Sequence, residues 1–120
     1  MEPTAESIAR EYFARMRAQD PNVAELFQED AVLLGLGTRV RGRPAIRDFY
    51  ARAIGESQPK PSEPVAFFTQ GNRVFAEIHI QMSDVAPIHA IDVFEVEAGR
   101  IRSLTYFIAD YPAEARPSVP

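Results

Sequence analysis

Apolar residues recur at helical spacing in two segments of the N-terminal half of the chain. Residues 4–18 and 44–54 each carry an apolar stripe, in which side chains three and four positions apart share one face. Thr4 suits the N-cap of the first segment, and Pro44 suits the first turn of the second, where a missing N–H costs little. Gly55 fits the residue that follows a helix. Both segments are therefore predicted to be amphipathic helices.

The segment between these two helices carries shorter patterns. Asn22 and Glu25 have the spacing of a capping box, which predicts a short helix over residues 22–27. An apolar run at residues 31–34 then fits a buried strand, and Gly35 weakens the continuation of that strand.

Alternating apolar and polar positions dominate the C-terminal half. Four strands are expected there, at residues 65–69, 73–82, 87–96 and 100–108. The turns between them are expected at Gly71–Asn72, Ser83–Asp84 and residues 97–99. Helices followed by a meander of strands predict one α+β domain over residues 1–120. A curved mixed or antiparallel sheet is expected to form a cone over three N-terminal helices, with room for a ligand inside.

One carboxylate interrupts the apolar face of the strand at residues 87–96. Period-2 alternation places five side chains on that face, namely Ile88, Ala90, Asp92, Phe94 and Val96. An ionised carboxylate is costly to bury there, so Asp92 is expected to have a partner or to stay protonated. A protonated acid in a cavity can donate a hydrogen bond to a ligand oxygen.

Three tyrosines are expected to face the same interior. Tyr12 and Tyr50 lie in the apolar stripes of the two longer helices, and a buried phenol needs a hydrogen-bond partner. Alternation along the last strand puts Tyr106 on one face with Leu104, and it puts Ile101 on the other. These phenols and the carboxyl group on the neighbouring strand would form a compact cluster of donors.

Composition and charge exclude several classes of function. The 120 residues carry a formal net charge of -4 and no cysteine, which excludes disulfides and thiolate metal sites and argues against a nucleic-acid partner. No apolar run approaches the roughly 20 residues of a membrane helix, and the N-terminus does not resemble a secretory signal. We therefore expect a cytoplasmic protein that handles a small molecule, with no membrane partner, metal or cofactor.

Four segments resemble ketosteroid isomerases in order and spacing, and together they span nearly the whole chain. They are Arg10–Phe13, Leu26–Val32, Gly42–Tyr50 and Ala90–Ile101. The wider nuclear-transport-factor-2-like superfamily, which includes the SnoaL-like polyketide cyclases, shares much of this pattern. The resemblance implies a cystatin-like α+β roll and a homodimer.

The resemblance also implies roles for particular residues. Tyr12 and Asp92 would be catalytic and form an oxyanion hole, in which two donors stabilise the charge that develops on a carbonyl oxygen. Tyr50 would support Tyr12 by a hydrogen bond, and ketosteroid isomerases keep the corresponding acid neutral by burying it. The expected ligand-binding residues are Tyr50, Tyr106, Phe94, Leu33 and Ile108. The substrate would be an apolar carbonyl compound of steroid or polyketide type.

One position departs from the resemblance. The general base of ketosteroid isomerases is an aspartate, and its counterpart here is Gly35, which cannot carry a proton. His79 and His89 have the side chain best matched to a base at neutral pH, but alternation places both on the face opposite Asp92. Asp110, just past the last strand, is a third substitute, at the mouth of the cavity.

Several functions stay open on these residues. The leading hypothesis is an isomerase-like or cyclase-like enzyme; in a polyketide-cyclase-like reaction, one strand carboxylate serves as both acid and base. A limonene-type epoxide hydrolase is less well supported, because the arginine expected two residues before Asp92 is Ala90. The alternative is a non-catalytic binding domain for a small hydrophobic ligand, which Gly35 favours. A further hypothesis is an assembly domain, since Ile91 and Phe107 on the outer sheet face would suit a homodimer.

Overall fold

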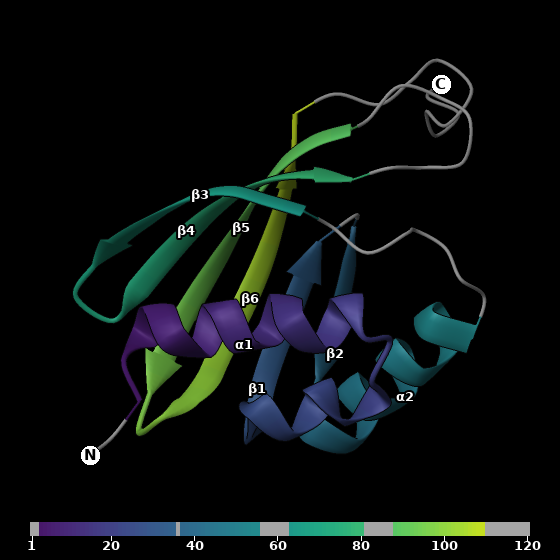
Figure 1. Cartoon of the computed structure of the whole chain (residues 1–120). Helices are drawn as coiled ribbons and strands as arrows, with labels where there is room; N and C mark the ends of the chain where they lie inside the picture. The colour runs from purple at the N-terminus through teal and green to yellow at the C-terminus, as the bar shows by residue number, and fades with distance from the viewer. Residues whose placement is uncertain (1–2, 36, 56–62, 81–87, 110–120) are drawn as a thin grey trace.

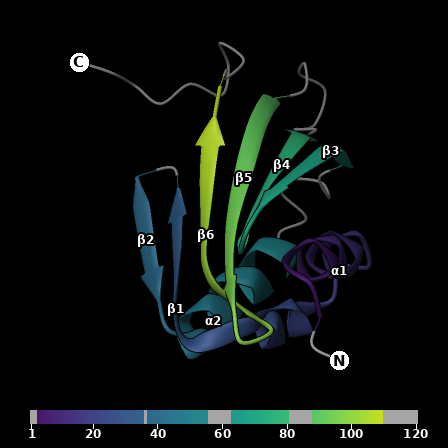
Figure 2. The same cartoon turned by 90° about the vertical axis from the view of Figure 1, so that its left-hand side faces the viewer.

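Three helices lie against one face of a curved six-stranded sheet (Figure 1). The computed structural model describes residues 3–35, 37–55, 63–80 and 88–109. The helices are α1 (Ala5–Arg17), the 3-10 helix η1 (Pro21–Leu26) and α2 (Arg43–Gly55). Viewed from the side, the sheet bends around the helices without closing on itself (Figure 2).

The sheet is mixed, with one parallel pair among antiparallel ones. Its strands are β1 (Phe27–Gly35), β2 (Thr38–Arg41), β3 (Glu63–Gln70), β4 (Arg73–Ile80), β5 (Ile88–Glu97) and β6 (Arg100–Ile108). Their order in space is β2-β1-β6-β5-β4-β3. The first strand runs parallel to the last, and every other neighbouring pair is antiparallel. The predicted α+β fold with a curved mixed sheet is therefore confirmed.

The two longer helices form where the apolar stripes predicted them. The Thr4 hydroxyl accepts a hydrogen bond from the Ser7 N–H at 3.1 Å, which satisfies one of the free donors at the start of α1. The prediction for the short middle helix needs a correction. It is a 3-10 helix capped by Asp20, whose carboxylate accepts from the Asn22 N–H at 2.9 Å, and it ends at Leu26.

The strand predictions need two corrections near the chain's first glycines. β1 begins at Phe27 rather than near residue 31, because Phe27 pairs with Ile101 of β6 and is fully buried. Strand β2, which pairs only with β1, was not predicted at all. The predicted turn at Ser83–Asp84 lies outside the described residues.

A β-bulge changes the alternation of β6. Ile101 is fully buried, so the prediction that it shares the outer face is wrong. Arg102 is an extra residue in the ladder between β5 and β6, and such a bulge reverses which face the neighbouring side chains take. Beyond the bulge the predicted alternation holds, and Tyr106 faces the helices.

The core fills the space between the helices and the inner face of the sheet. Phe13 of α1 packs edge-on against Phe67 of β3 and Phe94 of β5, with ring centroids 5.9 and 5.7 Å apart. Burying a ring of this size contributes roughly 1.5–3 kcal/mol. This packing holds α1 across the sheet and thereby fixes the direction in which the neighbouring side chains of α1 point. Across the described ranges, none of the helices has the length and apolarity to cross a bilayer.

Candidate functional site

Three tyrosine hydroxyls meet in a triangle between the helices and β6. The Tyr12 and Tyr50 oxygens lie 2.9 Å apart, and the Tyr12 and Tyr106 oxygens lie 3.1 Å apart. The Tyr50 and Tyr106 oxygens are closest, at 2.7 Å. Each hydroxyl comes from a different element, because Tyr12 lies on α1, Tyr50 on α2 and Tyr106 on β6. The predicted hydrogen bond between Tyr12 and Tyr50 is confirmed.

Aromatic packing sets the position of these hydroxyls. The Tyr12 ring lies edge-on to Phe27 and Phe94, with centroids 6.4 and 5.2 Å away. Tyr12 is 3% exposed and Tyr50 1%, whereas Tyr106 is only partly buried. Burial raises the pKa of all three phenols, so each stays a neutral hydroxyl group at physiological pH. The triangle can therefore donate and accept hydrogen bonds, but it cannot act as a base.

Asp92 lies next to this triangle on the inner face of β5. In the sheet it pairs with Ala76 of β4 on one side and with Tyr106 of β6 on the other. It is 1% exposed, as the alternation predicted, and its Oδ1 atom has no hydrogen-bond partner among the described residues. Burial raises the pKa of this carboxyl group well above its usual range, because water no longer solvates the charged form. An acid in this state is an unused hydrogen-bond donor and a potential proton carrier.

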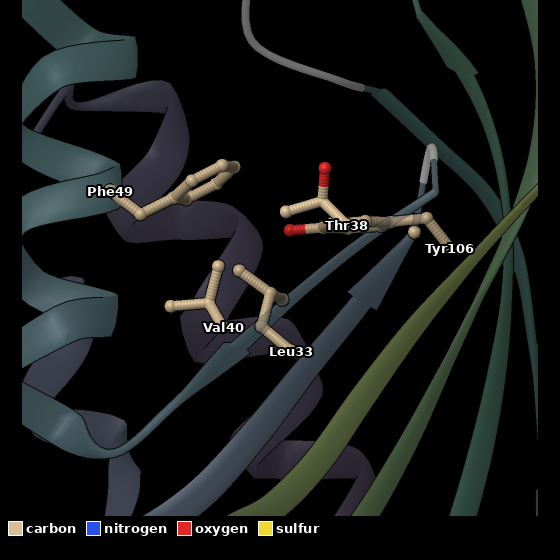
Figure 3. A pocket seen from close by; sticks show the side chains of 6 residues that line it. Leu33, Thr38, Val40, Phe49 and Tyr106 are labelled. Carbon is tan, nitrogen blue, oxygen red and sulfur yellow. The ribbon is translucent and has the colours of Figure 1, made fainter.

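A small pocket opens between α2 and the β1–β2 edge of the sheet (Figure 3). Its volume is about 50 Å³, and its lining residues are Leu33, Gly35, Thr38, Val40, Phe49 and Tyr106. Pockets that hold whole ligands usually measure roughly 300–1,000 Å³, so this pocket has room only for the end of a molecule. In Figure 3 the Tyr106 ring reaches from β6 across the pocket, and its hydroxyl points toward the α2 side. None of the lining residues that the structure describes has a charged side chain.

Gly35 and Tyr106 are in contact across the parallel β1–β6 pair. A Cβ atom added at Gly35 would lie 2.6 Å from Tyr106 Cδ2 and 2.8 Å from Tyr106 Cβ. Real Cβ atoms essentially never approach other atoms so closely. The ring of Tyr106 therefore occupies the space that a side chain at this position would need.

The predicted ligand-binding residues separate into three groups. Leu33 and Tyr106 line the pocket of Figure 3. Tyr50 and Phe94 are buried in the core and are not among its lining residues. Ile108 lies elsewhere, at a hollow of about 320 Å³ near the end of β6.

Three lining residues were missed as candidates. Thr38 and Val40 belong to β2, and Phe49 belongs to α2. The polar–apolar alternation of residues 38–41 is a weak strand signal that could have placed the first two of these side chains.

Neither histidine predicted as a substitute base joins the site. His79 and His89 pair across β4 and β5 on the outer face, as predicted, with ring centroids 4.7 Å apart. Asp110 lies outside the described residues. Within the part of the chain that the structure describes, no group of three or more histidine, cysteine or acidic residues is placed to hold a metal ion.

Comparison with known proteins shows which family and which solved structures this chain resembles. A family profile described as the SnoaL-like domain matches residues 9–104. The search of curated proteins found no match.

Solved structures similar to this chain share its fold. An NTF2-like protein from Cytophaga hutchinsonii is 17% identical, with 91% of this chain and 93% of that chain covered and a TM-score of 0.76. A putative polyketide cyclase from Sinorhizobium meliloti is 24% identical, with 82% and 92% covered and a TM-score of 0.75. SalBIII, an epoxide hydrolase/cyclase-like enzyme with a role in pyran ring formation in salinomycin, is 24% identical, with 88% and 90% covered and a TM-score of 0.76. At these identities the likeness shows the fold alone.

Proposed function

This chain belongs to the SnoaL-like domain family, and on that basis we propose that it is a cyclase-like or isomerase-like enzyme acting on a small carbonyl compound. The observation that carries the proposal is Asp92, the only charged residue buried among those described, with an oxygen that no described group satisfies. Burying such a group costs stability and packing alone does not explain it. Perturbed acids of this kind concentrate at functional sites.

The missing base favours a reaction that needs one carboxylate. In the ketosteroid-isomerase scheme Asp92 only donates a hydrogen bond, and a second acid near Gly35 moves the proton. Here Tyr106 fills the space beside Gly35, and the two histidines lie on the outer face. We therefore assign the proton transfer to Asp92 itself, as in a polyketide-cyclase-like reaction.

The proposed steps follow from the two kinds of group in the site, a carboxylate and neutral phenols. Asp92 in its ionised form, which burial makes a stronger base, takes a proton from the carbon beside the substrate carbonyl, and the electron pair moves onto the carbonyl oxygen. A neutral phenol, Tyr12 or one hydrogen-bonded to it, stabilises that oxygen. The enolate carbon then attacks a second carbonyl of the same molecule, and protonated Asp92 gives its proton to the new alkoxide. Returning the proton to another carbon instead would make the reaction an isomerisation.

Two of the similar structures support a ring-forming reaction. One is named a putative polyketide cyclase, and the other an epoxide hydrolase/cyclase-like enzyme. The second candidate function is a non-catalytic binding domain for a small hydrophobic ligand. Gly35 in place of the base favours it, because loss of a base removes turnover before it removes the cavity.

Hydrogen exchange tests the removal of a proton from the carbon beside the carbonyl, a step that the cyclisation and the isomerisation share. The purified protein is mixed with cyclohexenone in heavy water, and exchange at the carbon beside the carbonyl is followed by NMR. Wild type is expected to accelerate exchange over buffer, and Asp92→Asn to lose about a hundredfold or more of that acceleration, the usual share of general base catalysis. Asp48→Asn is the matched control, because Asp48 is exposed on α2.

The outcomes separate the two candidate functions. Exchange that survives in Asp92→Asn contradicts the role of this carboxylate. Binding of the ketone without any exchange in wild type supports the non-catalytic binding domain instead.

A further inference from the structure

The three phenols differ in how accessible they are from the pocket beside α2. Tyr12 is 3% exposed and Tyr50 is 1% exposed, and neither lines the pocket beside α2. Tyr106 lines that pocket, and its hydroxyl points into it (Figure 3). A ligand that enters the pocket therefore meets the Tyr106 hydroxyl before either of the others.

The triangle can donate one external hydrogen bond if it gives up one of its own contacts. Each hydroxyl has one proton to donate, so three mutual contacts use all three protons. The Tyr12–Tyr106 contact is the longest, at 3.1 Å, and the Tyr50–Tyr106 contact is the shortest, at 2.7 Å. An acceptor oxygen in the pocket would draw the Tyr106 proton away from the weakest of the three contacts. The remaining order, Tyr12 to Tyr50 to Tyr106 to ligand, is a chain in which each bond polarises the next.

Gly35 makes this position of Tyr106 possible. The ring lies in the volume that any side chain at residue 35 would occupy. The rest of the lining is apolar, with Leu33, Val40 and Phe49, apart from the hydroxyl of Thr38.

We propose that Tyr106, held over Gly35, is the ligand-facing hydrogen-bond donor of this site, and that Tyr12 and Tyr50 are positioning residues behind it. Its ligand is a molecule whose small apolar end carries one acceptor oxygen, such as a ketone. This inference rests on the proposed function, since it concerns the same substrate, but it differs from the family resemblance, which makes Tyr12 the donor.

Carbonyl NMR of a bound ketone tests the assignment. Cyclohexenone labelled at its carbonyl carbon is titrated into the wild-type protein, and the resonance is expected to move in the direction that a hydrogen bond to the oxygen produces. Tyr106→Phe keeps the ring but should abolish that movement and weaken binding about threefold to tenfold, the range of a single neutral hydrogen bond. Tyr12→Phe should keep a smaller movement, because it shortens the chain without removing the terminal donor.

A second pair of variants tests the role of Gly35. Gly35→Ala should displace the Tyr106 ring and reduce the carbonyl movement. Gly55→Ala is the matched control, since a Cβ built there meets no described atom within 4 Å outside its own stretch of α2. It should leave the resonance as in wild type.

The failures of the two proposals are distinguishable. If Tyr106→Phe keeps the full movement while Tyr12→Phe or Asp92→Asn abolishes it, the assignment of Tyr106 is wrong and the proposed function stands. If wild type neither binds the ketone nor exchanges its hydrogens, both proposals are wrong.

Discussion

Replacing Gly35 by alanine is expected to destabilise the fold, although the change adds only one methyl group. The new Cβ would lie 2.6 Å from Tyr106 Cδ2 and 2.8 Å from Tyr106 Cβ. Rotating the ring could relieve the first contact but not the second, because the Cβ atom of Tyr106 is fixed by the backbone. That backbone is held in the sheet between β1 and β5. Relief therefore requires β1 and β6 to move apart.

Two opposing effects set the size of the change. Overpacking a well-packed site costs about 1–3 kcal/mol. Replacing a glycine that has no positive φ angle also removes conformational freedom from the unfolded chain, which stabilises by about 0.4–1 kcal/mol. The clash is the larger effect, so we expect Gly35→Ala to lower the free energy of unfolding by about 1–2 kcal/mol. For a domain of this size, that corresponds to a fall in Tm of roughly 4–8 °C.

Urea and thermal unfolding of matched variants measure this effect. Gly55→Ala has the same change in composition but no neighbouring atom within 4 Å, so only the stabilising effect remains and the sign should reverse. In a Tyr106→Ala background, Gly35→Ala should cost less, because the contact with Cδ2 is removed and only the contact with the Cβ atom of residue 106 remains. The reasoning is refuted if both alanine variants shift stability in the same direction. It is also refuted if the cost of Gly35→Ala is unchanged when Tyr106 is truncated, since residues in contact are expected to couple.

Two further predictions concern charge and assembly. The folded state binds the Asp92 proton more tightly than the unfolded chain does, because burial raises the pKa of this group. The stabilisation that this bound proton gives is therefore complete below the unfolded pKa of about 3.9 and is lost as pH rises through the folded pKa. The loss amounts to about 1.4 kcal/mol for each unit by which the folded pKa exceeds the unfolded one. Asp92→Asn should remove this pH-dependent loss of stability. The free energy of unfolding of the variant should therefore rise relative to that of wild type as pH increases from 4. A difference between the two proteins that does not change with pH contradicts this prediction. The outer sheet face exposes Phe68, Ile91 and Phe107, at 62%, 44% and 58%, and we expect it to bury them in a homodimer. Sedimentation velocity should show wild type as a dimer and Phe107→Glu as a monomer, and a monomeric wild type at micromolar concentration contradicts the proposal.

The features that could be predicted from the sequence are those with a local period. The stripe that carries Tyr12 repeats every three to four residues, and the strand that carries Asp92 alternates every two. In each case one face is buried, so the period alone shows which side chains point inward. Because both inner faces border one core, the sequence alone predicts that Tyr12, Tyr50 and Asp92 lie close to one another.

The features that could not be predicted depend on pairing between distant strands. Strand β2 is a short edge strand with mostly exposed side chains, so only a weak alternation over four residues marks it. The bulge at Arg102 has no local signal, and it turned Ile101 inward. The contact between Gly35 and Tyr106 follows from the register of β1 against β6, in which Leu34 pairs with Thr105. Nothing in either segment alone fixes that register.

The same contact changes the meaning of Gly35. The family resemblance alone indicates only that Gly35 stands where a general base is expected. If the site had merely lost that base, the space of the missing side chain would be empty. Here the space beside Gly35 holds the ring of Tyr106, whose hydroxyl joins those of Tyr12 and Tyr50. The group that fills this space is a phenol held neutral by burial, which donates a hydrogen bond where a carboxylate would accept a proton. Asp92 is then the one acid among the described residues of the site, and on this ground we propose single-carboxylate chemistry rather than the two-carboxylate scheme of the ketosteroid isomerases.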